Sequence, residues 1–376
     1  MRRSQVRVLI LTASYGSGHN EAAHCLAAGF ERAGAQAIVV DHFKALVNPA
    51  FERATRAFYF ALLRRAPLVW GMAYGVGDWL ASDSVLTFGA TRVGAAALGR
   101  LVHRLAPDAV VSVHATPAAV MSTLLGQGHR LPPHTTVVTD FVAHSQWIAP
   151  NIDRYCVAAD EVQHEFVARG IPRERVAVTG VPVRAEFATP VDAAAARRAL
   201  GLSPRTPVVL AMAGSYGSVG RLPDVARALL ALERPPQGVL VAGRDVALAA
   251  TLQRLTAGTT LRTVGYSSDV RTLMAAADLL ITKAGGMTLA EAMAAEIPLL
   301  AYGSLPGQER RNERFASRAG IALIARSRRD LRRLIAQALG DPELLEHLRE
   351  RMRRARRPDA TARIVAAVLE RAVLLS

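Results

Sequence analysis

The sequence predicts an α/β protein with parallel sheets, because its strand and helix patterns alternate regularly. Short runs of β-branched and apolar residues are followed by longer helical patterns along the whole chain. The alternation begins again in the second half, and 376 residues suit two domains better than one compact core. We assign residues 1–182 to a first domain, 183–206 to a proline-containing linker, 207–357 to a second domain and 358–376 to a C-terminal helix.

The expected strands follow from these apolar runs. In the first domain they lie near residues 6–12, 37–40, 109–113, 135–139, 154–158 and 176–179. In the second domain they lie near residues 208–212, 238–242, 261–264, 279–282, 298–301 and 322–324. Helical patterns between them include residues 20–33, 84–105 and 161–169. Parallel sheets place ligand-binding loops at the carboxyl ends of their strands, so two such domains facing each other would enclose a cleft.

The charge balance points to an anionic partner. There are 46 Lys+Arg against 31 Asp+Glu, a net charge of +15, and every basic residue except Lys44 and Lys283 is an arginine. This excess favours a nucleic acid, an acidic membrane surface or a phosphorylated ligand, although it could also be general solubilising charge. Because no nucleic-acid-binding module is recognisable, we do not expect a nucleic-acid partner.

Composition excludes several other classes of protein. A chain that is 51% hydrophobic and 20% charged is not disordered. No apolar run reaches the roughly 20 residues that span a bilayer, and the N-terminal apolar stretch is too short for a secretory signal. Cys25 and Cys156 fit neither a disulfide framework nor a zinc-finger spacing. We therefore expect a cytosolic protein.

A glycine-rich loop, SYGSGHNEAA, follows the first expected strand. Gly16 and Gly18 permit a tight turn and Asn20 can cap the next helix, which places His19 at the strand end as a candidate general base. The spacing matches neither the dinucleotide fingerprint nor a P-loop. A purely structural turn would also explain the loop.

His114, which follows a later strand, is either a further site candidate or an ordinary core histidine.

Two loops of the second domain suit a diphosphate. AGSYGSVG at residues 213–220 precedes a helix that begins near Leu222, so its amides could bind phosphate oxygens or merely form a turn. The second loop follows a strand that runs into Lys283, with a helix expected to start at Met287 or Thr288. There, Gly285, Gly286 and Thr288 can present amides and a hydroxyl to a diphosphate.

Polar residues continue at the next loop–helix junctions. Glu291 lies three residues beyond Thr288, within reach of ribose hydroxyls. Gln308 and Glu309 follow the next strand and could hold sugar hydroxyls, and Asn312 lies one turn into the following helix. A purely structural explanation must account for all of these positions, so we favour a binding site.

A third cluster follows a strand of the first domain. Asp140, His144 and Trp147 could bind an acceptor or support a base. Together with His19 they offer metal ligands, but without a spacing such as H-E-x-x-H we expect no zinc site.

Residues 49–80 combine aromatic and basic side chains on a helix-forming segment. This combination suits an interfacial membrane contact. An amphipathic helix packed on the sheet is the alternative. The residues that would dock are Arg53, Arg56, Phe58, Phe60, Arg64, Arg65, Trp70 and Trp79.

These motifs resemble one family of lipid glycosyltransferases. It includes the bacterial processive diacylglycerol β-glucosyltransferases and the plant monogalactosyldiacylglycerol synthases, and is more distantly similar to the peptidoglycan transferase that glucosaminylates lipid I. RVLILTASYGSGH resembles the family's N-terminal glycine loop, and VVTDFVAHSQWIAPNIDRYCVAADEV resembles its acceptor segment. The stretch from GYSSDV to RRNERF is similar to the nucleotide-sugar motif.

The resemblance implies a GT-B architecture, with two Rossmann-like domains facing across a cleft and a final helix, near residues 360–374, packed on the first. It implies inverting transfer of glucose or galactose from a UDP-sugar to the 3-hydroxyl of 1,2-diacylglycerol, without a metal or other cofactor. His19 would be the catalytic base, and Asp140, His144 and Trp147 would lie on the acceptor side. The implied donor-binding residues are Gly18, Ser215, Gly217, Gly265, Tyr266, Gly285, Gly286, Thr288, Glu291, Gln308, Glu309 and Asn312, of which Gly265 and Tyr266 match the uracil stretch.

The family also implies a monotopic protein at the cytoplasmic face of the cell membrane, attracted to an anionic surface. One departure is that some members have Pro-Gly or Gly-Pro where this chain has Ala-Gly-Gly-Met, which bears on donor preference more than on phosphate binding. Two alternatives stay open. The same donor site could serve a non-lipid acceptor, or the chain could be a non-catalytic UDP-sugar sensor.

Overall fold

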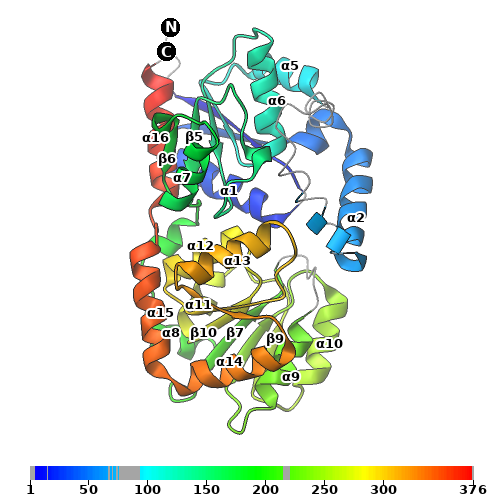
Figure 1. Ribbon diagram of the computed structural model, residues 1–376, viewed down its shortest axis with the longest axis vertical. Coiled ribbons are helices and arrows are strands. Elements are labelled where there is room, and N and C mark those ends of the chain that lie inside the picture. Colours follow the sequence, from blue (N-terminus) through cyan, green and yellow to red (C-terminus); the bar gives the residue numbers. More distant parts are fainter. Residues whose placement is uncertain are drawn as a thin grey trace. The chain divides into compact units, whose positions relative to one another are not determined.

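The protein consists of two α/β units, each built on its own parallel sheet (Figure 1). The structure is a computed structural model that describes residues 5–14, 16–66, 68–69, 71–72, 75, 94–214 and 221–374. The first unit comprises residues 1–62, 68–185 and 357–376, and the second comprises residues 63–67 and 186–356.

The first unit has a six-stranded parallel sheet in the order β2-β1-β3-β4-β5-β6. The strands are β1 Arg7–Thr12, β2 Gln36–Asp41, β3 Ala109–Ser112, β4 His134–Val137, β5 Arg154–Val157 and β6 Val176–Val178. Both β1 and β3 are interior strands, and Leu9 of β1 pairs with Val110 of β3. Helices cover both faces of such a sheet, which explains why β1 reads as a continuous apolar run.

The second unit repeats this plan with the strand order β12-β11-β10-β7-β8-β9. The strands are β7 Val208–Met212, β8 Gln237–Val241, β9 Leu261–Val264, β10 Leu279–Thr282, β11 Leu299–Tyr302 and β12 Ala322–Ala325. The order changes direction between β7 and β10, and ligands bind at such switch points in open parallel sheets.

The helices flank these sheets. In the first unit they are α1 Ser17–Arg32, α2 Pro49–Arg65, α5 Ala95–Leu105, α6 Ala115–Gly126, α7 Asp160–Ala168 and α16 Ala360–Leu374, with short turns η1 Phe43–Val47, η2 Ser145–Trp147 and η3 Arg173–Arg175. In the second unit they are α8 Ala193–Ala199, α9 Leu222–Leu230, α10 Val246–Thr256, α11 Val270–Ala276, α12 Gly286–Ala295, α13 Gln308–Arg318, α14 Arg328–Gly340 and α15 Pro342–Ala355.

Every predicted strand is present, with ends that differ by at most two residues from the prediction. Two other segments differ more. The helix expected over 84–105 is described only from Ala95, because residues 76–93 lie outside the described part of the chain. The stretch 183–206, interpreted as a linker, contains the short turn η4 Ala185–Ala188 and helix α8, which packs on α11 of the second unit. Its alanine-rich sequence and the Asp192 cap explain the helix.

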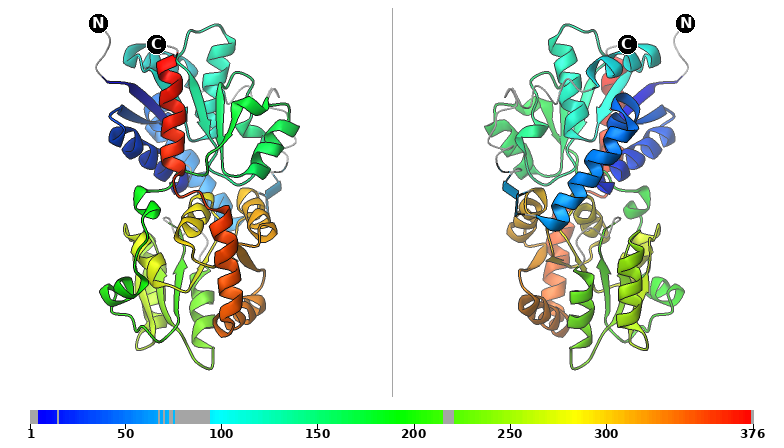
Figure 2. Two further views of the ribbon diagram at one scale, coloured as in Figure 1. Left: turned by 90° about the vertical axis from the view of Figure 1, so that its left-hand side faces the viewer. Right: turned by 90° about the vertical axis from the view of Figure 1, so that its right-hand side faces the viewer.

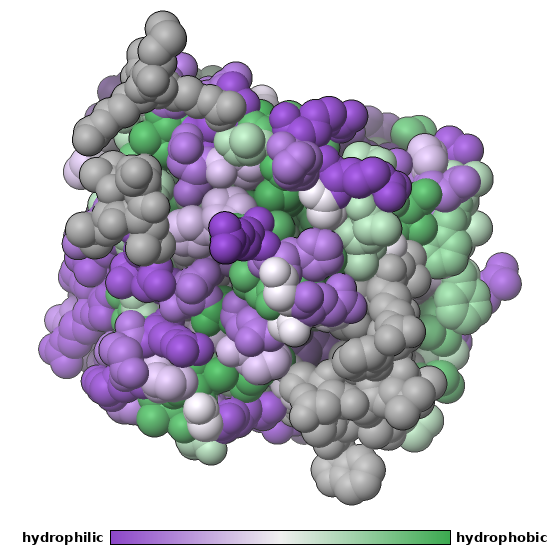
Figure 3. All heavy atoms as spheres, turned by 90° about the horizontal axis from the view of Figure 1, so that it is seen from above, coloured by the Kyte–Doolittle hydropathy of each residue, from purple (hydrophilic) through white to green (hydrophobic). Residues whose placement is uncertain are grey.

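Helix α2 carries the aromatic and basic segment, and much of it is exposed. Phe51 and Phe58 are 45% and 70% exposed, and they lie seven residues apart on one face of the helix. Arg56 instead pairs with the buried carboxylate of Glu52 at 2.7 Å. In Figure 3 hydrophilic residues dominate the face shown, and hydrophobic residues gather at its right-hand edge, the side on which α2 lies in Figure 1. Trp70 and Trp79 and the Arg64 side chain lie outside the described residues.

The last helix belongs to the first unit. Helix α16 lies along α1 and β3 (Figure 2). A Cβ added at Gly29 of α1 would meet Thr361 Cγ2 at 2.9 Å, so the glycine allows the two helices to approach closely. The Thr361 hydroxyl donates to the Val183 carbonyl at 2.6 Å and accepts from the Val183 N–H at 3.1 Å. One buried side chain thus satisfies both backbone groups of Val183.

We expect Thr361→Val to destabilise the first unit. The substitution keeps the side-chain volume but leaves the buried N–H and C=O of Val183 without partners, at a cost of about 1–3 kcal/mol per group. For a unit of this size, the melting temperature should fall by about 2–8 °C in a thermal scan. Thr251→Val is the matched control, because its hydroxyl bonds the Ala247 carbonyl on an exposed helix face. An unchanged melting temperature for Thr361→Val would show that this contact is unimportant.

Candidate functional site

His19 lies in the first turn of α1, at the carboxyl edge of the first sheet. Because β1 and β3 are neighbours, the loop after β1 lies beside the residue that follows β3. The Nδ1 atom of His19 is 2.8 Å from the Val113 carbonyl oxygen and 3.2 Å from Thr139 Oγ1. A carbonyl can only accept, so Nδ1 carries the hydrogen. In the neutral ring, Nε2 is therefore left with a free lone pair, as a general base requires.

Two predicted candidates surround this histidine. The His114 ring stands edge-on to the His19 ring with centroids 4.7 Å apart, and the Trp147 ring lies at 6.1 Å. His114 Nδ1 accepts the Thr116 N–H at 3.1 Å, so its neutral ring carries the hydrogen on Nε2. His114 is thus part of this site and also the cap of α6. The structure brings together loops that follow β1, β3 and β4.

The surroundings of His19 set its charge. Burial lowers the pKa of His19 from its ordinary value of 6.5, while the nearby Asp140 carboxylate and the Val113 carbonyl act in the opposite direction. Burial, and secondarily the neighbouring His19 and His42, holds the pKa of His114 well below 6.5. At neutral pH both rings are uncharged, and the carboxylate makes His19 the more readily protonated of the two.

The acceptor-side candidate His144 has a structural partner. His144 is buried, and its Nδ1 accepts the Gln146 N–H at 3.1 Å as the cap of the turn η2. Thr139, which the sequence interpretation did not select, contacts His19 directly. Its only signal in the sequence was its position immediately before Asp140.

In the second unit, α12 begins at Gly286, one residue before the predicted start, with Gly285 as its cap. A Cβ at Gly285 would meet no described atom within 4 Å, so the approach to this turn is open. The first amides of a helix lack intrahelical acceptors and favour an anion. Thr288 is half-buried in the first turn, and Glu291 is 8% exposed one turn further on.

The predicted sugar-binding residues hold the adjoining loops together. The Glu309 carboxylate forms an ion pair with Lys283 through one oxygen and accepts the Leu305 N–H at 2.9 Å through the other. Asn312 is fully buried and donates to the Ala284 carbonyl at 3.2 Å. These bonds brace the loop before α12 against the loop before α13. A contact between these residues, or Gln308, and a sugar remains a prediction.

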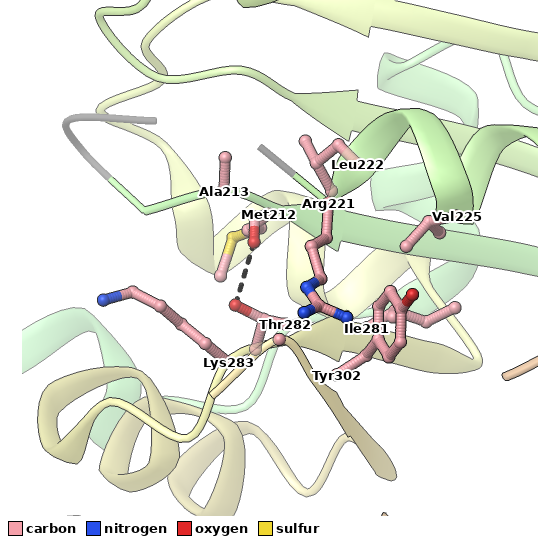
Figure 4. A pocket seen from close by; sticks show the side chains of 10 residues that line it. Met212, Ala213, Arg221, Leu222, Val225, Ile281, Thr282, Lys283 and Tyr302 are labelled. Atoms are coloured by element: carbon pink, nitrogen blue, oxygen red, sulfur yellow. Dashed lines mark hydrogen bonds between the residues drawn. The ribbon is translucent and has the colours of Figure 1, made fainter. Parts of the chain in front are cut away.

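A pocket at the carboxyl ends of β7 and β10 adjoins Lys283 (Figure 4). In Figure 4 the Lys283 side chain extends away from Arg221 and Tyr302, and the Arg221 guanidinium lies over the Tyr302 ring at 5.3 Å. The Thr282 hydroxyl bonds the Met212 carbonyl at 2.9 Å. Of the two basic residues that line the pocket, Lys283 is paired with Glu309, so Arg221 is the one that suits a negatively charged group.

The remaining donor candidates have different outcomes. Tyr266 is 52% exposed after β9, with the Arg244 guanidinium 4.5 Å above its ring, and Gly265 precedes it. Gly18 lies in the first turn of α1 in the other unit. Ser215 and Gly217 fall outside the described residues.

Across the part of the chain that the structure describes, no three His, Cys, Asp or Glu side chains are grouped as a metal site would require.

Asp140→Asn should lower the pKa of His19 further, because it removes the carboxylate that favours the imidazolium. An NMR titration of the His19 ring protons in the wild-type protein and in Asp140→Asn measures this directly. A His19 pKa that stays the same or rises in Asp140→Asn would contradict the assigned electrostatics.

Sequence comparison relates both halves of the chain to glycosyltransferases. Residues 19–183 match the profile of the monogalactosyldiacylglycerol (MGDG) synthase family, and residues 197–355 match that of the glycosyl transferases group 1. A processive diacylglycerol beta-glucosyltransferase of Bacillus pumilus is 30% identical over 372 residues, covering 98% of this chain and 96% of the relative.

Solved structures share the fold. MurG of Acinetobacter baumannii superposes with a TM-score of 0.66 at 18% identity, covering 97% of this chain and 99% of that one. HepE of Anabaena, solved in complex with UDP-glucose, gives a TM-score of 0.57 at 14% identity, covering 97% and 100%. The fold is therefore GT-B, as the resemblance implied. The chain belongs to the lipid glycosyltransferase family that contains the processive diacylglycerol beta-glucosyltransferases and the monogalactosyldiacylglycerol synthases.

Proposed function

We propose that this protein transfers a hexose from a UDP-sugar to the 3-hydroxyl of 1,2-diacylglycerol, with inversion at the anomeric carbon. The observation that carries the proposal is the 2.8 Å contact between His19 Nδ1 and the Val113 carbonyl, which assigns the hydrogen to Nδ1 and leaves Nε2 unprotonated in the neutral ring. This ring lies near Trp147 and Asp140. Family membership supplies the substrate class, because the relatives over the full length are named diacylglycerol glucosyltransferases. We expect UDP-glucose to be the better donor for the same reason.

In the proposed reaction His19 is the general base. Nε2 takes the proton of the acceptor hydroxyl while that oxygen attacks the anomeric carbon, and the bond from this carbon to the UDP oxygen breaks on the opposite face. Asp140 stabilises the imidazolium that forms. The departing UDP carries negative charge, which the first amides of α12 would stabilise. Lys283 contributes less to this, because Glu309 neutralises it.

Lipid product analysis tests this function. Purified protein is incubated with diacylglycerol vesicles and either UDP-glucose or UDP-galactose, and the glycolipids are identified by mass spectrometry. Loss of a general base commonly costs about 10²–10⁴-fold in turnover. We expect a loss of that size in His19→Ala with unchanged UDP affinity, and none in His129→Ala, a change at an exposed histidine. Near-normal turnover of His19→Ala would remove His19 from this role.

The same assay separates the alternative functions. A diacylglycerol transferase needs a bilayer or detergent-dispersed lipid, whereas an enzyme that acts on a water-soluble acceptor does not. A UDP-sugar sensor would bind UDP without forming any glycolipid. The base-ready tautomer of His19 favours an enzyme over a sensor, because a sensor has no proton to remove.

We further propose that α2 docks peripherally on an anionic membrane. None of the described helices combines the length and apolar character needed to cross a bilayer. Phe51 and Phe58 are exposed on one face of α2, and Arg53 and Arg65 are exposed on the same helix. Aromatic side chains at the acyl boundary and arginines at headgroup level are the pattern of an interfacial helix. Arg56 contributes less than its sequence suggested, because Glu52 neutralises it.

Replacing Arg53 and Arg65 with glutamine should weaken binding to anionic vesicles. Each basic residue near such a surface contributes about 1 kcal/mol, so the pair should lower the partition coefficient by about tenfold or more at low salt. Vesicle sedimentation measures this. The matched control is Arg329→Gln/Arg333→Gln on α14, which removes the same charge from exposed positions of the second unit. Equal effects of the two double variants would mean that α2 has no special role at the membrane.

A further inference from the structure

The chain has only two lysines, and one of them, Lys44, lies at the carboxyl edge of the first sheet, near the loop that leads to His19. Lys44 Nζ donates to Ser14 Oγ at 2.9 Å, and its backbone N–H donates to Asp41 Oδ1 at 3.0 Å. Its ammonium lies 3.8 Å from Asp41 Oδ2. None of these residues is part of the site described above.

Ser14 is the centre of a complete hydrogen-bond network. Its hydroxyl donates to Asp41 Oδ2 and accepts from both Lys44 Nζ and Asn20 Nδ2, the latter at 3.0 Å. A hydroxyl has one donor and two acceptor positions, so all of its capacity is used. Ser14 is 2% exposed, so losing one member of the network removes one of the three hydrogen bonds of a buried hydroxyl.

Asn20 connects this network to the candidate base. It follows His19 in the first turn of α1, and its Oδ1 accepts the Thr12 hydroxyl at 2.9 Å while its Nδ2 reaches Ser14. Both ends of the side chain are therefore fixed to the end of β1 and the loop after it. The start of α1 has no side-chain cap, because its cap residue is Gly16, so the side chains of the first turn hold it in place. Besides Asn20, these are His19, bonded to the Val113 carbonyl, and Glu21, which pairs with Arg184 at 3.5 Å.

We propose that Lys44 acts through Ser14 and Asn20 as a positioning residue for His19. The Val113 carbonyl fixes the ring, and the Lys44–Asp41–Ser14–Asn20 network fixes the helical turn that carries it. A lysine suits this place because its compact ammonium can bond Ser14 while remaining near Asp41, whereas the planar guanidinium of arginine has a different donor geometry. The expected loss of kcat rests on the proposed function, whereas the positioning of the His19 ring does not.

The kinetic test compares Lys44→Met, Ser14→Ala and the double variant. A displacement of about 1 Å can cost about 10²-fold in rate, so we expect each single variant to lower kcat by about 10–100-fold, with the KM for the UDP-sugar and the UDP affinity unchanged. The double variant should lose no more activity than the less active of the two single variants, because both changes break one network. Arg32→Met, at the exposed far end of α1, removes the same charge and should retain normal kcat. Losses that multiply, or a normal kcat in Lys44→Met, would overturn the proposal.

A second readout is independent of the reaction. In Lys44→Met the NMR signals of the His19 ring should shift, while those of His134, which is buried and bonded to Ser112 at 2.8 Å, should stay in place. An inactive wild-type enzyme with this shift in Lys44→Met would reject the proposed function but retain the positioning role. A His19 signal identical to wild type would reject the positioning role whatever the activity.

Discussion

The site of the first unit depends on the parallel pairing of β1 with β3. The register of these strands, in which Leu11 lies opposite Ser112, brings the start of α1 beside the Val113 carbonyl. That single carbonyl determines which nitrogen of His19 carries the hydrogen. Had β3 been displaced by one residue, a different backbone group would face the ring, because neighbouring residues of a strand point in opposite directions. The chemistry of His19 is therefore a consequence of sheet geometry.

Charge is arranged differently in the two units. In the first, burial keeps the histidines neutral while Asp140 makes His19 the preferred proton acceptor. In the second, Lys283 and Glu309 form an ion pair beside an open helix start. Displacement of a nucleoside diphosphate needs a base and a group that stabilises the departing negative charge, and the first amides of α12 suit the second task. Both lysines of this arginine-rich chain lie at the carboxyl edges of the sheets, where a compact ammonium bonds one neighbouring oxygen.

The fold was largely predictable from sequence, because the apolar runs of buried parallel strands are local signals. The runs at 208–212, 261–264 and 279–282 match β7, β9 and β10. The glycine loop and the residues around α12 were also found locally, by turn chemistry and helix spacing. The partners of the site residues were not, since His19 bonds Val113 and Thr139, which lie far along the chain. The ion pair between Glu309 and Lys283 was likewise not predictable, because the two residues meet only in three dimensions. The cleft between the domains and the donor contacts remain predictions.

The tautomer of His19 tests the central claim most directly. Nitrogen-15 chemical shifts distinguish a protonated ring nitrogen from an unprotonated one, and they can be measured at a pH where the ring is neutral. We predict a hydrogen on Nδ1, bonded to the Val113 carbonyl, and an unprotonated Nε2. A hydrogen on Nε2 would leave no lone pair for the acceptor hydroxyl and would contradict the assignment of His19 as the base.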